Sequence, residues 1–77
     1  MAKKHSEQKI IVKIEKRIKE MRVVHGISQE QLAFETGLPR VQIGRIERGE
    51  INTTIGTLVI ICKALYVHPK ELFDIEI

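Results

Sequence analysis

Three glycines divide the middle of this chain into short helical segments, and their spacing restricts the possible folds more than any other feature. Gly26, Gly37 and Gly49 suit the left-handed backbone conformation that commonly follows the last turn of a helix. They leave one short helix over residues 29–36 and another over residues 39–48, where a proline fits the first turn. No segment shows a convincing strand pattern, so the sequence predicts an all-α protein.

A longer amphipathic helix precedes these segments. From Ser6 to Gly26, apolar residues recur at spacings of four and three and make one stripe, formed by Ile10, Ile14, Ile18 and Met21. Lysines and glutamates, including Glu15, fill the other faces. Ser28 and Gln31 then have the spacing of a capping box, in which the serine hydroxyl accepts a hydrogen bond from a free backbone N–H.

Two further helices are expected after Gly49. Thr54 is suited to cap a helix over residues 55–65, one face of which is lined by Ile55, Leu58, Val59, Cys62 and Leu65. Pro69 then opens a short helix that ends near Phe73. Together the segments predict a compact bundle of five helices.

Length and charge limit how the chain is organised. Its 77 residues are expected to form a single domain over residues 6–77, preceded by a short, basic and disordered arm over residues 1–5. The net charge of +3 permits binding to nucleic acid without requiring it. A domain of this size buries only roughly 60% of the surface of its unfolded chain, so docking against a second copy would stabilise it.

The sequence offers no support for catalysis, for a metal site or for a cofactor. Its histidines, His5, His25 and His68, share no ligand spacing with the single cysteine, Cys62, which is expected to be a small buried hydrophobe. There is no phosphate-binding glycine loop and no nucleophile with a recognisable base. No signal peptide is present, and no apolar run approaches the roughly 20 residues of a membrane helix, so a cytoplasmic protein is expected.

The helix over residues 39–48 has two contrasting faces. On a helical wheel, the residues expected to face the core are Pro39, Ile43 and Ile46, and Gln42 and Glu47 lie at the edges. The opposite face carries Arg40, Val41, Gly44, Arg45 and Arg48. Arginine can donate two parallel hydrogen bonds to guanine, and valine can contact the thymine methyl group. This face fits the major groove of DNA, with Gly44 allowing close approach, although three arginines alone also suit a solvated surface.

Several segments together resemble the helix-turn-helix family of the phage Cro and cI repressors. They are MRVVHGISQEQLA (residues 21–33), TGL (36–38) and IGRIERG (43–49), followed by LVIICKAL and HPKELF. In that family the second helix crosses the DNA backbone and the third lies in the major groove. The resemblance implies that bases are read by Arg40, Val41, Gln42 and Arg45. Phosphate contacts are expected from Gln29, Arg48, Asn52 and Thr53, and the alternative for the glutamine is a surface residue that starts a helix.

The resemblance also implies an ion pair between Arg22 and Glu47 that holds the first helix to the third. A carboxylate on a DNA-binding helix needs a neutralising partner, because phosphates would repel it; the alternative is two unrelated surface charges. The family usually has a side-chain cap at the position of Pro39, so the start of the third helix can shift by a residue. Val41 and Gly44 also depart from the family pattern, which leaves the target sequence open.

The sequence therefore predicts a DNA-binding transcriptional regulator. Its small size resembles stand-alone regulators such as restriction–modification controller proteins and minimal phage repressors. We expect it to bind a palindromic operator as a homodimer. Candidates for the dimer contact, which could instead close the core of the monomer, are Tyr66, Val67, Leu72, Phe73 and Ile75. An alternative from another class is a protein-interaction module, such as an antitoxin that binds its toxin.

Overall fold

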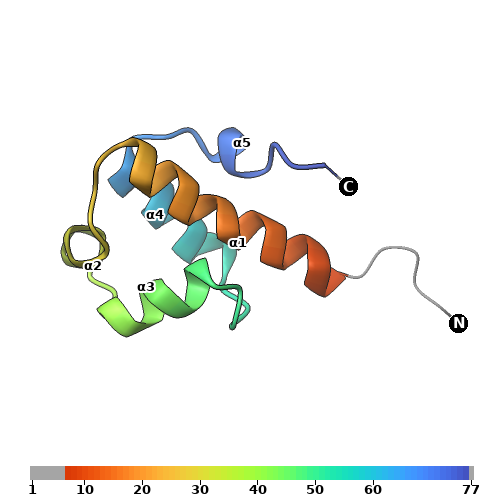
Figure 1. Ribbon diagram of the computed structural model, residues 1–77, viewed down its shortest axis with the longest axis horizontal. Coiled ribbons are helices and arrows are strands. Elements are labelled where there is room, and N and C mark those ends of the chain that lie inside the picture. Colours follow the sequence, from red (N-terminus) through yellow and green to blue (C-terminus); the bar gives the residue numbers. More distant parts are fainter. Residues whose placement is uncertain (1–6, 77) are drawn as a thin grey trace, which may run out of the picture.

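The computed structural model describes residues 7–76, which form five α-helices (Figure 1). These are α1 (Glu7–Val24), α2 (Gln29–Thr36), α3 (Arg40–Glu47), α4 (Ile55–Leu65) and α5 (Pro69–Leu72). No residue between 7 and 76 lies in a β-strand. The prediction of an all-α fold with five helices is confirmed, and α2 and α4 begin and end where the sequence placed them. The predicted arm over residues 1–5 lies outside the described residues.

Side-chain caps explain why α2 and α4 begin where they do. Ser28 Oγ accepts a hydrogen bond from the backbone N–H of Gln31 at 3.0 Å, and Thr54 Oγ1 accepts one from Thr57 N–H at 3.1 Å. Each bond satisfies a backbone donor that the first turn of a helix leaves free. α3 lacks such a cap, because Pro39 precedes its first residue and makes no capping hydrogen bond, so the helix begins one residue later than the predicted range.

α5 begins with a capping box that the sequence analysis did not predict. His68 Nδ1 accepts a hydrogen bond from Lys70 N–H, and Glu71 Oε2 accepts one from His68 N–H, each at 3.1 Å. This histidine therefore serves a structural role at the start of the last helix. The helix is one residue shorter than predicted and ends at Leu72.

The helices enclose a single apolar core. Figure 1 shows α1 crossing the molecule, with α2 and α3 on one side of it and α5 on the other, and α1 packs against α3, α4 and α5. The buried apolar residues come from all five helices and from the segment before α5: Ile18, Met21, Leu32, Ile43, Ile46, Leu58, Ile61, Cys62, Leu65, Val67 and Leu72. The prediction that Cys62 is a buried hydrophobe is confirmed, and burial raises the pKa of its thiol.

The predicted inward face of α4 is partly wrong. Ile55 is 73% exposed and Val59 is also exposed, whereas Ile61 is fully buried beside Leu58 and Leu65. α4 has apolar residues on almost every side, so its sequence pattern does not indicate which side faces the core. The consequence is an apolar outer surface on this helix.

Glu15 differs most from its predicted position on a polar face. It is 0% exposed, and its Oε2 accepts a hydrogen bond from Thr53 N–H at 3.1 Å, while its Oε1 is buried without a hydrogen-bond partner among residues 7–76. Burial raises the pKa of Glu15, and the bond from Thr53 offsets part of that increase. The segment after α3 packs closely against α1 here, since Thr53 donates to this carboxyl and a Cβ built on Gly49 would lie only 2.8 Å from Val12 Cγ1.

Candidate nucleic-acid interface

α3 presents a basic surface on the side away from the core. Ile43 and Ile46 are fully buried, whereas Arg40, Val41 and Arg45 are exposed, the valine at 71%. Gln42 is half-buried, in keeping with an edge position. The four residues implied to read bases therefore include three that lie open to solvent on one helix. Pro39, which the wheel placed toward the core, is exposed and stands just before the helix.

Gly44 does not leave a bare patch on this surface, contrary to the prediction. It is buried, and a Cβ built on it would lie 3.0 Å from Arg48 Nη1 and 3.8 Å from Gln29 Nε2. The space that the glycine provides is therefore occupied by the guanidinium of Arg48, one turn further along. A side chain at position 44 would displace that guanidinium, so this glycine sets where Arg48 lies.

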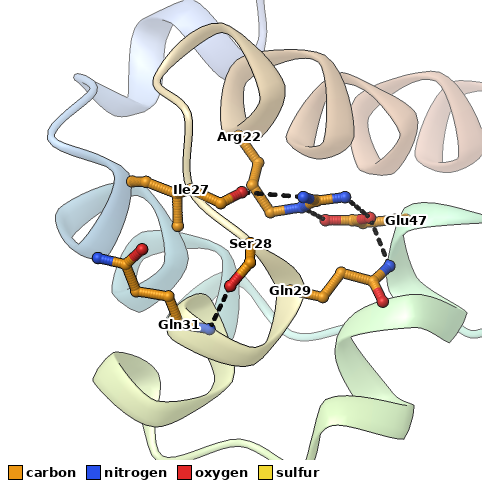
Figure 2. A network of polar contacts seen from close by, with 6 residues as sticks. All are labelled: Arg22, Ile27, Ser28, Gln29, Gln31 and Glu47. Atoms are coloured by element: carbon orange, nitrogen blue, oxygen red, sulfur yellow. Dashed lines mark hydrogen bonds and ion pairs between the residues drawn. The ribbon is translucent and has the colours of Figure 1, made fainter.

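Arg22 and Glu47 form a buried, two-pronged ion pair (Figure 2). Arg22 Nε lies 2.6 Å from Glu47 Oε2, and Arg22 Nη2 lies 3.0 Å from Glu47 Oε1. Their side chains are 11% and 1% exposed. Arg22 Nη1 also donates to the carbonyl of Ile27 at 2.9 Å, so one guanidinium ties α1 to α3 and to the α1–α2 loop. Glu47 is thus buried rather than at an edge of the helix, because Arg22 neutralises it.

Gln29 joins the same network from the first residue of α2. Its Nε2 donates to Glu47 Oε1 at 3.0 Å, as Figure 2 shows. An amide nitrogen carries two N–H groups, so one remains for another acceptor. The residue also stands at the end of a helix where free N–H groups and the helix dipole favour an anion. Gln29 is therefore held in place by a buried carboxylate at a position suited to a phosphate.

The loop between α3 and α4 carries the other expected phosphate contacts. Asn52 is exposed and Thr53 is half-buried. The Thr53 N–H is already donated to Glu15, which leaves its hydroxyl rather than its backbone for a phosphate. Arg48 is paired with Glu50, since its Nε lies 2.7 Å from Glu50 Oε2. Sequence reasoning missed both Glu15 and Glu50; for Glu50 the available signal was its place two residues after Arg48.

The five residues proposed for dimer contact divide into two groups. Val67 and Leu72 are buried in the core of the monomer, so the prediction that they contact a second copy is wrong and the alternative role applies to them. Tyr66 and Phe73 are exposed, the tyrosine at 83%, and Ile75 is partly buried. Other exposed apolar residues lie on α4: Ile55 and Val59, which sequence reasoning placed on one face with core residues, and Ile60.

Other kinds of site find no structural basis in the described part of the chain. Residues 7–76 contain no group of three or more His, Cys, Asp or Glu side chains arranged to hold a metal ion. Within the same residues, no helix combines the length and hydrophobicity that crossing a membrane requires.

Comparison with known proteins gives a consistent result. The sequence profile of the family described as helix-turn-helix matches residues 18–72. The chain is 44% identical over 55 residues to control protein C.SmaI of Serratia marcescens, covering 71% of this chain and 66% of that protein. It is 49% identical over 49 residues to control protein C.BamHI of Bacillus amyloliquefaciens, covering 64% and 60%. The matches span less than two thirds of either relative's own length.

Two solved structures resemble this fold over most of the chain. The restriction-modification controller protein C.AhdI from Aeromonas hydrophila has a TM-score of 0.77 and 41% identity, covering 82% of this chain and 96% of that chain. The controller protein C.Esp1396I, solved as a tetramer in complex with its natural 35 base-pair operator, has a TM-score of 0.78 and 36% identity, covering 91% and 90%.

Proposed function

This chain belongs to the helix-turn-helix family, and from that premise we propose that it is a transcriptional regulator of the restriction–modification controller type. It binds operator DNA with α3 in the major groove. The observation that carries the proposal is the exposed surface of Arg40, Val41 and Arg45 on a helix whose far side is locked to α1 by the buried ion pair of Arg22 and Glu47.

The chemistry of that surface is suited to reading bases. The fork of donors on Arg40 and Arg45 matches the N7 and O6 acceptors of guanine, and the Val41 methyl groups match the thymine methyl group. Gln42 at the edge can reach adenine. Gln29 before this surface, and Arg48, Asn52 and Thr53 after it, act as the phosphate contacts that fix the helix in the groove. The buried ion pair supplies the rigidity that such readout needs, because it fixes α3 against α1.

A second copy of the chain completes the operator-binding unit. One module of this kind buries only about 600–1,000 Å² against DNA, which limits its specificity. The outer surface of α4 is an apolar patch, defined here as Ile55, Val59, Ile60 and Tyr66, all of them exposed. This patch contacts the identical patch of a second copy, since a two-fold dimer places two recognition helices on successive major grooves. The tetrameric assembly of C.Esp1396I on its operator supports this choice.

The proposed function assigns no catalytic step to the chain. It regulates by occupying DNA, and we place it in the cytoplasm, where a bacterial regulator meets its operator. No observation favours the alternative of a protein-interaction module.

Selection of random duplex DNA by the purified chain tests this function directly. A palindrome should be enriched at about physiological salt. Arg40→Ala and Arg45→Ala should each lose about 1–3 kcal/mol of discrimination at one base position per half-site. Lys70→Ala is the matched control, because it removes one exposed positive charge from α5, across α1 from α3. If both arginine variants behave like Lys70→Ala, α3 is not the reading helix.

The dimer is tested separately by sedimentation. Ile55→Asp should shift the chain to monomers at micromolar concentration and weaken operator binding. Val24→Asp, at an exposed apolar residue of α1 outside the patch, should not. Monomers of the unchanged chain at that concentration, without DNA, would exclude a preformed dimer.

A further inference from the structure

Glu50 holds both arginines at the end of the reading helix. Its Oε2 accepts a hydrogen bond from Arg48 Nε at 2.7 Å, and its Oε1 lies 3.4 Å from Arg48 Nη2. The same Oε1 lies 3.7 Å from Arg45 Nε. One carboxylate therefore contacts the arginine expected to read a base and the arginine expected to bind a phosphate.

The position of this carboxylate is set by the backbone. Gly49 adopts a left-handed conformation with φ of +72°, and the Glu50 N–H then donates to the carbonyl of Arg45 at 2.9 Å. This is the hydrogen-bond pattern that commonly closes the last turn of a helix. It fixes the start of the Glu50 side chain beside the last turn of α3.

Arg48 is also confined from the other side. Its Nη1 lies over Gly44, at 3.0 Å from the place of a Cβ, while its Nε and Nη2 face Glu50. The hydrogen bond between them raises the pKa of Arg48 and lowers that of Glu50, so both stay charged at neutral pH. In the free chain the Nε and Nη2 groups of this guanidinium are therefore already directed at a carboxylate.

We propose that Glu50 is a specificity-determining residue that weakens binding to non-operator DNA by competing with phosphates for Arg45 and Arg48. The inference rests on the proposed function. Non-specific binding depends almost entirely on arginine and lysine contacts to phosphates, which carry no sequence information. A phosphate can bind these arginines only if it displaces Glu50 or lies next to the negative charge of its carboxylate. At an operator, Arg45 reads guanine with its two Nη groups while its Nε keeps its place beside Glu50, so less of the Glu50 interaction is lost there and binding is weakened less.

The contact is weak enough to be exchanged. All three side chains are about half exposed, at 50% for Arg45, 58% for Arg48 and 47% for Glu50. Exposed ion pairs of this kind correspond to changes of about twofold to fivefold in an equilibrium constant. Glu50 therefore tunes affinity without preventing DNA binding.

The test compares Glu50→Gln with the unchanged chain on two duplexes, a random-sequence duplex and the operator obtained by selection, over a range of salt. Affinity for the random duplex should rise by about threefold. The slope of log affinity against log salt should also become steeper, by the amount that corresponds to about one more phosphate contact. Affinity for the operator should rise less, so the ratio between the two should fall. Asp74→Asn is the matched control, because it removes one exposed negative charge from the tail after α5.

A second arm separates competition from simple repulsion. In an Arg48→Ala background, Glu50→Gln should raise the affinity for the random duplex much less than it does in the unchanged chain. The same increase with and without Arg48 would show that Glu50 acts only by repelling DNA and would overturn the proposal. The proposal would also be overturned if Glu50→Gln changed the affinity for the random duplex no more than Asp74→Asn does, or if it weakened binding. If the unchanged chain shows no salt-dependent DNA binding at all, the proposed function itself fails.

Discussion

Replacing the buried carboxyl of Glu15 by an amide should stabilise this protein at neutral pH. Glu15 Oε1 has no hydrogen-bond partner among the described residues, and the side chain is fully buried. A buried polar atom without a partner costs about 1–3 kcal/mol, and more when the group is charged. Glu15→Gln keeps a carbonyl oxygen for Thr53 N–H and removes the charge, but it places an unpaired NH₂ group in the same space. We expect a net gain of about 1 kcal/mol at pH 7, or about 4–8 °C in Tm.

The gain should depend on pH in a defined direction. Burial raises the pKa of Glu15 in the folded chain above the value of about 4.3 expected in the unfolded chain. The folded state therefore binds the proton more tightly, which stabilises it below that unfolded pKa, and this contribution is lost as pH rises through the folded pKa. Glutamine does not titrate. The difference in stability between the two proteins should be largest at neutral pH and should close as pH falls toward about 4.

Urea unfolding followed by circular dichroism, from pH 7 to pH 4 at one protein concentration, measures this difference. Glu20→Gln is the control, since Glu20 lies on the same helix with a side chain that is 68% exposed. Its effect should stay within about 0.5 kcal/mol. A Glu15→Gln protein that is less stable than the unchanged chain at pH 7, or a difference that does not vary with pH, would refute the reasoning.

Two further predictions concern the contacts that fix α3. Arg22→Ala and Glu47→Ala should each cost about 3–5 kcal/mol of unfolding free energy, because each leaves a buried charge unpaired. The double variant should cost much less than the sum of the two. Additive losses in urea unfolding would contradict the buried pair. Gly49→Ala should cost about 2–3 kcal/mol, because it adds a clash with Val12 to the strain of a left-handed backbone. Gly37→Ala is the control, since φ there is +77° and a Cβ built on it would meet no other side chain within 4 Å among residues 7–76. It should cost only about 1 kcal/mol in the same urea unfolding, and equal losses for the two variants would exclude the clash.

Local signals made much of the fold predictable from the sequence. Ser28 and Thr54 mark helix starts because each supplies its own cap, and Gly37 marks a helix end because it takes a left-handed conformation. The inward side of α4 was not predictable, because Ile55 and Ile61 are equally apolar and only the neighbouring helices decide which is buried.

From the residue pattern alone, the candidate site was predictable only where one helix determines it. The Arg22–Glu47 pair, which joins α1 to α3, was predicted through the family resemblance instead. The exposure of Arg40, Val41 and Arg45 follows from the helical wheel of α3 alone. The burial of Glu15 depends on the loop that covers it, and the environment of Gly44 depends on side chains from α2 and from the end of α3. A charge pattern read along one segment does not contain such contacts between segments.

The length of α3 limits how much information one copy can take from DNA. Its 8 residues, at about 1.5 Å each, span about 12 Å, or roughly four base-pair steps. A given four-base sequence occurs by chance about once in 256 positions, and two half-sites together about once in 65,000, against the roughly 10⁶ or more competing sites of a genome. Even a dimer would therefore find about 15 chance matches among 10⁶ sites, and more in a larger genome. For the proposed regulator, selective occupancy therefore depends on the abundance of the protein as well as on the base sequence, so the amount of regulator becomes part of the signal it transmits.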